Sequence, residues 1–168
     1  MLKIRMIALS VGIIGALAVV AADAAPEAAK ALPVTVADHM RAAIEVPAQG
    51  IWGVQFEEKL SDDQWRLLDQ DATALAVAAG ALTSPGTGKA DAAWARNADW
   101  QSWTGELQRA ALELRTAARA KDQDKLMAGG DRLQEVCQGC HAKYRPQTPS
   151  DGVTRYPYYP KRELPPSG

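Results

Sequence analysis

Four stretches of the chain repeat small or apolar residues at steps of three and four, and this spacing constrains the fold more than any other feature. Such steps put the residues on one face of an α-helix. The four stripes are Val36, Met40, Ile44, Pro47, Ile51 and Val54; Trp65, Leu68, Ala72, Leu75, Ala79 and Leu82; Trp100, Trp103, Leu107, Ala110, Leu114 and Ala117; and Leu126, Gly130, Leu133, Cys137, Cys140 and Tyr144. No stretch alternates as a β-strand does. The sequence therefore predicts an all-α fold, an antiparallel four-helix bundle.

Capping residues stand where these helices should begin. Thr35 with Asp38 and Ser61 with Gln64 form the pattern of a capping box, and Asn97 is placed to cap the third helix. These residues predict helix starts near 36, 62 and 98.

Two places depart from a regular helical sequence. Pro47 lies inside the first helix, where it removes a backbone hydrogen bond and predicts a kink near Ala43–Pro47. Gly129-Gly130 weakens the fourth helix by up to about 2 kcal/mol against alanine. The pair indicates either a helix that starts late, near Asp131, or a close approach of a backbone or a cofactor.

The two ends of the chain differ from the middle. Lys3 and Arg5, the apolar run Met6–Ala22 and the small-residue site Ala22-Asp23-Ala24 are typical of a secretory signal peptide, with an uncleaved anchor as the alternative. We predict a signal peptide over 1–24, one helical domain over 25–145 and a flexible tail over 146–168, which is rich in proline and tyrosine. The net charge of −1 gives no sign of a nucleic-acid or anionic-membrane partner.

The chain's most specific chemical motif is Cys137-Gln138-Gly139-Cys140-His141. On a helix both thiols lie on one face within about one turn, and His141 lies about 40° round from Cys137. This is the spacing of covalent c-type haem attachment, in which two thiols form thioethers with the porphyrin vinyl groups and the imidazole binds the iron. The motif predicts one covalent haem c, held by Cys137 and Cys140, with His141 as the proximal iron ligand inside the bundle.

Three other uses of paired cysteines compete with this interpretation. A zinc site needs further ligands, and the only other histidine, His39, lies far away in the sequence. A redox dithiol is expected beside a βαβ pattern, which is not visible. A structural disulfide would leave a helical adaptor without haem. No Ser-His-Asp set, paired-carboxylate geometry or phosphate-binding loop is present, so we expect no enzymatic activity beyond redox.

The export signal, the four helices and the ending Cys-x-x-Cys-His-x-x-Tyr-Arg at 137–145 together resemble the class II c-type cytochromes, cytochrome c′ and its low-spin relatives. The segment Met40–Trp52 is similar to a divergent proteobacterial branch of that class. The resemblance implies that Arg145 lies near the proximal pocket and that the first helix covers the distal face. It also implies redox protein partners, leaves a homodimer through the first two helices open, and places the protein in the periplasm.

The sixth iron position decides between two functions. Met40, on the inward stripe of the first helix, is the candidate distal ligand; His39 is a second candidate, expected to face solvent or the bundle edge, and an empty position is the third. A thioether ligand raises the reduction potential and suits single-electron transfer. An empty position would bind nitric oxide or carbon monoxide. We expect a periplasmic monohaem electron carrier, with the five-coordinate gas-binding protein as the alternative.

Overall fold

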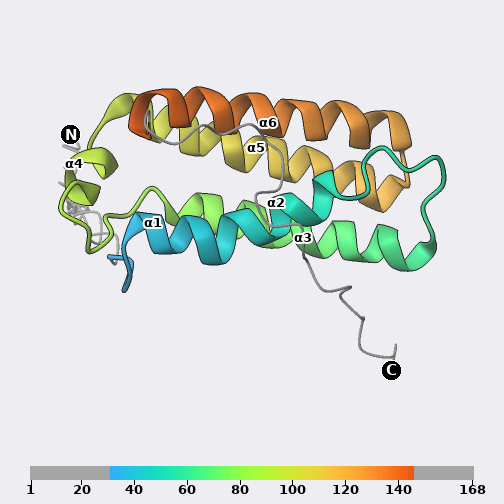
Figure 1. Cartoon of the computed structure of the whole chain (residues 1–168), viewed down its shortest axis with the longest axis horizontal. Coiled ribbons are helices and arrows are strands. Elements are labelled where there is room, and N and C mark those ends of the chain that lie inside the picture. The colour runs from blue at the N-terminus through green and yellow to red at the C-terminus, as the bar shows by residue number, and fades with distance from the viewer. Residues whose placement is uncertain (1–30, 146–168) are drawn as a thin grey trace, which may run out of the picture.

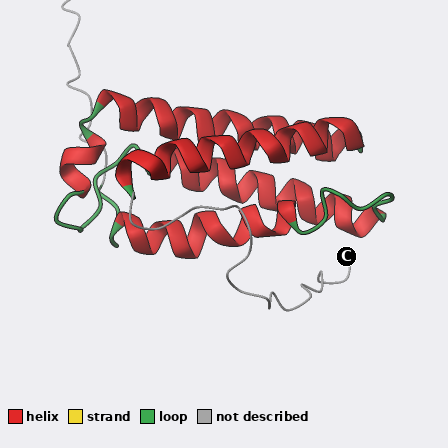
Figure 2. Cartoon of the chain, turned by 45° about the horizontal axis from the view of Figure 1, so that its top comes forward, coloured by secondary structure: helices red, strands yellow, loops and turns green. Residues whose placement is uncertain are grey.

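The computed structural model describes residues 31–145, in which all regular structure is helical (Figures 1 and 2). The elements are α1 (Val36–His39), the π-helical turn η1 (Met40–Ile44), α2 (Glu45–Trp52), α3 (Asp62–Ala81), α4 (Asp91–Ala95), α5 (Ala98–Ala120) and α6 (Gln123–Tyr144). The all-α prediction is confirmed. The signal peptide and the tail predicted over 1–24 and 146–168 lie outside the described residues. In the described part, no helix is both long and apolar enough to cross a membrane.

The elements α1, η1 and α2 follow one another without a break and together form the first long helix. This helix and the helices α3, α5 and α6 lie side by side (Figure 1). α3 packs on α5 along its length, α5 packs on α6, and α2 contacts both α3 and α6. The core is formed by the predicted stripes, with Ile51, Leu75, Leu126 and Leu133 fully buried. The short helix α4 was not predicted; it lies beside the start of α5 at one end of the bundle (Figure 1).

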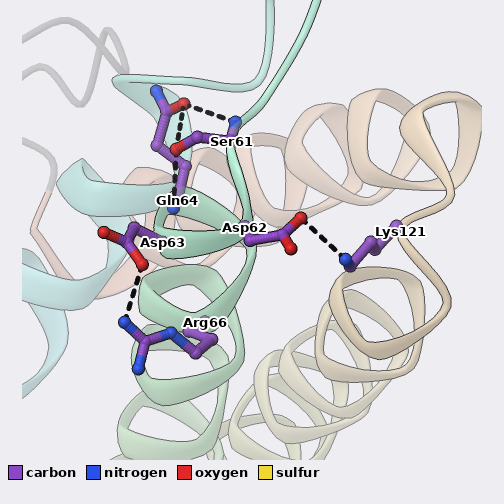
Figure 3. Close-up of polar contacts among 6 residues, drawn as sticks. All are labelled: Ser61, Asp62, Asp63, Gln64, Arg66 and Lys121. Atoms are coloured by element: carbon purple, nitrogen blue, oxygen red, sulfur yellow. Dashed lines mark hydrogen bonds and ion pairs between the residues drawn. The ribbon is translucent and has the colours of Figure 1, made fainter. Parts of the chain in front are cut away.

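The predicted caps are confirmed. The Ser61 hydroxyl accepts from the Gln64 N–H at 3.3 Å, while the Gln64 side chain accepts from the Ser61 N–H at 2.8 Å, so that both form a capping box (Figure 3). Thr35 accepts from the Asp38 N–H at 3.0 Å, and Asn97 accepts from the Asp99 N–H at 2.9 Å. Each bond satisfies an N–H that the first turn of the helix leaves without a partner.

An ion pair joins the end of α5 to the start of α3. Lys121 ends α5 in the left-handed conformation, with φ of 52°, and its Nζ lies 2.8 Å from Asp62 (Figure 3). On the first turn of α3, Asp63 pairs with Arg66 at 2.7 Å. Both pairs are exposed, so each adds less than about 1 kcal/mol to the stability.

The first long helix is irregular near the place that Pro47 predicts. Met40–Ile44 form a π-helical turn, in which the Glu45 N–H donates to the carbonyl of Met40, five residues earlier. Pro47 has no N–H and its ring clashes with the carbonyl four residues earlier, so it excludes a regular turn over 43–47. The predicted departure therefore takes the form of a π-helical turn just before the proline.

A buried carboxylate holds the start of this helix. Asp91, only 4 % exposed, accepts from the Val36 N–H at 2.9 Å and from the Gly88 N–H at 2.8 Å. A Cβ at Gly88 would lie 2.7 Å from both carboxylate oxygens, so the loop approaches this closely only with glycine. Asp91 therefore fixes α1 to the segment before α5, a role that the sequence did not predict.

The glycine pair in α6 marks a close approach, because the helix runs unbroken from Gln123 and the late start near Asp131 is wrong. A Cβ at Gly130 would overlap the Gln55 amide, and a Cβ at Gly129 would lie 2.8 Å from the Leu114 side chain. The Gln55 and Leu114 side chains therefore lie in the space that the two glycines leave.

We expect Gly130→Ala to lower the free energy of unfolding by about 1–3 kcal/mol, because the new methyl group must displace the buried Gln55 side chain. Gly105→Ala in α5 is the matched control, since nothing lies within 4 Å of a Cβ there. In this control the free energy of unfolding should rise by up to about 1 kcal/mol, because alanine has the higher helix propensity. Urea unfolding followed by circular dichroism measures both, and equal effects would contradict the close approach at Gly130.

Candidate cofactor site

The motif occupies the last two turns of α6. Cys140 is buried, while Cys137 and His141 are half-buried on the same side of the helix. The fourth stripe continues through Leu133 and Gly130, which are buried one and two turns earlier. The two thiols and the imidazole thus face the other helices of the bundle.

One ring nitrogen of His141 has no hydrogen-bond partner among the described residues. This atom, Nδ1, is buried. Burial and then the nearby positive charge of Arg145 hold the pKa of His141 below its usual range, so the ring is neutral at neutral pH. A neutral imidazole is the form that binds metal ions.

Both cysteines are free thiols. Burial, followed by the neighbouring Cys140, raises the pKa of Cys137 to about 12, and burial raises the pKa of Cys140 to about 11. The thiols therefore stay protonated at neutral pH, unlike the low-pKa cysteine of a redox dithiol.

Three contacts with α5 hold the motif in place. Gly139, between the two thiols, packs against the Trp103 ring of α5, and Lys143 pairs with Asp99. At the end of α6, the Tyr144 ring lies edge-on to Trp100, with ring centroids 4.9 Å apart. α5 therefore sets the position of the segment from which the motif projects.

The layer around the motif is more exposed than the rest of the core. The inward side chains Met40, Cys137, His141 and Tyr144 are half-buried, whereas those of Ile51, Leu126 and Leu133 have no exposed surface. α1 and η1 also approach α6 much less closely than α3 approaches α5. Together with an unpartnered neutral imidazole and two protonated thiols, this layer fits a haem bound from the α6 side.

The structure places the other candidate residues as follows. Met40 lies in η1, half-buried against the core. His39 lies at the bundle edge, where its Nε2 is 2.8 Å from the Ala78 carbonyl of α3 and must donate, because a carbonyl only accepts. Arg145 follows directly after α6, and its N–H donates to the His141 carbonyl at 2.8 Å.

Sequence reasoning missed the support that Trp103 gives to Gly139. The signal was present, since glycine at a helical position is costly unless another group approaches closely. The partner was not readable, because the contact joins residues on different helices.

Gly139→Ala should lower the free energy of unfolding by about 1–3 kcal/mol, because a Cβ would overlap the Trp103 ring. Gln138→Ala, at an exposed position beside it, should change it by less than about 0.5 kcal/mol. The double variant Gly139→Ala with Trp103→Leu should recover part of the loss, which a double-mutant cycle by denaturant unfolding measures. Strictly additive effects would show that the two residues do not contact.

Among the described residues, no three or more His, Cys, Asp or Glu side chains gather as a metal-binding group.

In comparison with known proteins, the family model described as Cytochrome C' matches residues 54–145, more than half of the chain. The match covers α3, α5 and α6 and begins after the first long helix. No curated protein matches the chain. The chain therefore belongs to the cytochrome c′ family, a family of haem-binding cytochromes.

Proposed function

We propose that the protein is an exported monohaem c-type cytochrome that carries single electrons between redox proteins. Cys137 and Cys140 hold the haem covalently, His141 is its proximal ligand and Met40 its distal ligand. The observation that carries the proposal is the buried, unpartnered Nδ1 of a neutral His141 beside two free, protonated thiols. Bound haem supplies an iron that changes by one electron between its ferric and ferrous states.

The state of the thiols suits covalent attachment. Each S–H adds across one vinyl C=C, so that an S–C bond and a C–H bond form and no atom is lost. The addition needs two reduced thiols, and both cysteines are free and largely removed from solvent. The stiff helical segment, held by Trp103 through Gly139, keeps both sulfurs on one side.

Met40 determines the type of function. Its thioether is neutral, binds iron without losing a proton, and raises the reduction potential. Met40 is partly buried and packs against the core, which supports an inward position on the first helix. Arg145, whose charge acts on His141, adds a positive charge on the proximal side.

Export supports the same function, because haem is joined to c-type cytochromes outside the cytoplasmic membrane and members of the cytochrome c′ family are typically periplasmic. The apolar segment Met6–Ala22 and the following Ala22-Asp23-Ala24 are the features of the sequence that support export.

Covalent attachment predicts a mature protein heavier than its polypeptide by one haem, measured by mass spectrometry after denaturation. Cys137→Ser and Cys140→Ser should each leave one thioether and shift the pyridine haemochrome band. The double variant should lose its haem on acid extraction, whereas Gln138→Ala should behave as the wild type. Haem that is fully extractable from the wild type would contradict attachment at this motif.

Methionine ligation predicts sharp α and β bands in the dithionite-reduced spectrum that carbon monoxide does not change. Met40→Ala should give a high-spin spectrum that shifts on adding carbon monoxide. Met127→Ala is the control, because Met127 is 40 % exposed near the other end of α6. A wild-type spectrum that is already high-spin and shifts with carbon monoxide would contradict electron transfer through a six-coordinate iron and favour the gas-binding alternative.

A further inference from the structure

The π-helical turn η1 begins at the candidate distal ligand. We propose that the extra residue of η1 sets the register of the first helix, so that Met40 and not Arg41 faces His141. This inference rests on the proposed function, because it explains how the distal ligand of that haem is selected.

One contact shows which sides of the two helices face each other. The Trp52 Nε1–H donates to the Gly130 carbonyl at 3.1 Å, so it joins the end of α2 to α6. His141 follows Gly130 by eleven residues, which is close to three turns of 3.6 residues. His141 therefore lies on the side of α6 that faces the first long helix, about 16 Å further along the bundle.

The same count applies to the first long helix, which runs in the opposite direction (Figure 1). In a regular α-helix the residue three turns before Trp52 is Arg41. A turn bonded from i to i−5 contains one residue more than a turn bonded from i to i−4, so it rotates all earlier residues by about 100°. Met40 then takes the place of Arg41, at the level of His141 and on the side toward α6.

The surroundings of the neighbouring residues agree with this register. Arg41 is exposed and pairs with Asp38 at 2.6 Å, away from the core. His39 precedes Met40 by one residue and so lies about 100° round the helix from it. Its ring faces α3 and donates to the Ala78 carbonyl. Met40 packs against the core.

Three groups hold the register. Pro47 has no N–H to donate to the Ala43 carbonyl, so the regular hydrogen-bond pattern is interrupted over 43–47. Asp91 binds the Val36 N–H at the start of α1, and His39 binds the Ala78 carbonyl. The last bond also keeps the chain's only other imidazole away from the iron.

A matched pair of histidine substitutions tests the register in the mature holoprotein. Met40→His should give the electron paramagnetic resonance signal of a low-spin ferric iron with two imidazole ligands, whereas Arg41→His should not. The bis-imidazole signal in Arg41→His, or in both variants, or in neither, would overturn the proposal. The wild-type spectrum is a separate readout: if it is high-spin, Met40 is not the ligand and the proposed function fails, while the pair still reports the register.

Deletion of Ala42 gives a second test that needs no new ligand. Ala42 is exposed within η1, and its loss places Trp52 eleven residues after Met40, so that a regular α-helix presents Met40 on the same side. The wild-type optical spectrum should be retained. A changed spin state in a deletion variant with unchanged helix content would overturn the proposal. This test remains decisive if Met40→His does not accumulate as holoprotein.

Discussion

The absence of a side chain at Gly130 is the constraint on which the candidate site depends. Because no Cβ stands there, the Gln55 amide fills the space and the Trp52 indole donates to the helix backbone. A hydrogen bond of this kind adds only about 1 kcal/mol, but it fixes both the axial position and the rotation of the first long helix against α6. In the proposed register, the positions of Met40 and His141 follow from this contact by counting helical turns, so Gly130, three turns from His141, determines which residue of the first helix faces His141.

The two sides of the site are held by different means. On the proximal side, α6 is a regular helix that packs on α5 through Trp103 and through the aromatic cluster of Tyr144, Trp100 and Trp94. On the distal side, the first helix contains a π turn and is attached at its start by Asp91. His141, the proposed proximal ligand, is thus placed by packing. Met40, the proposed distal ligand, is placed by the helical register, which a single inserted or deleted residue changes.

Much of the fold could be predicted from the sequence, because apolar spacing and capping are local signals. The stripes through Ile51 and Leu75 and the caps at Ser61 and Asn97 needed only neighbouring residues. The π turn, the Asp91 anchor and the bond from His39 to Ala78 could not be predicted in the same way. The Asp91 and His39 bonds each join residues from different elements. The π turn is local, but it differs from a kinked α-helix only in its backbone hydrogen bonds.

The family match includes one side of the candidate site and leaves out the other. It includes α6, with the two thiols and His141, and it begins only after the helix that carries Met40. Membership therefore identifies the class of cofactor but leaves the sixth position to residues outside the match. An iron that has an imidazole on one side takes its potential and its access to small ligands from the other side. In the proposed register, the difference between an electron carrier and a gas-binding protein depends on one additional residue in the first helix.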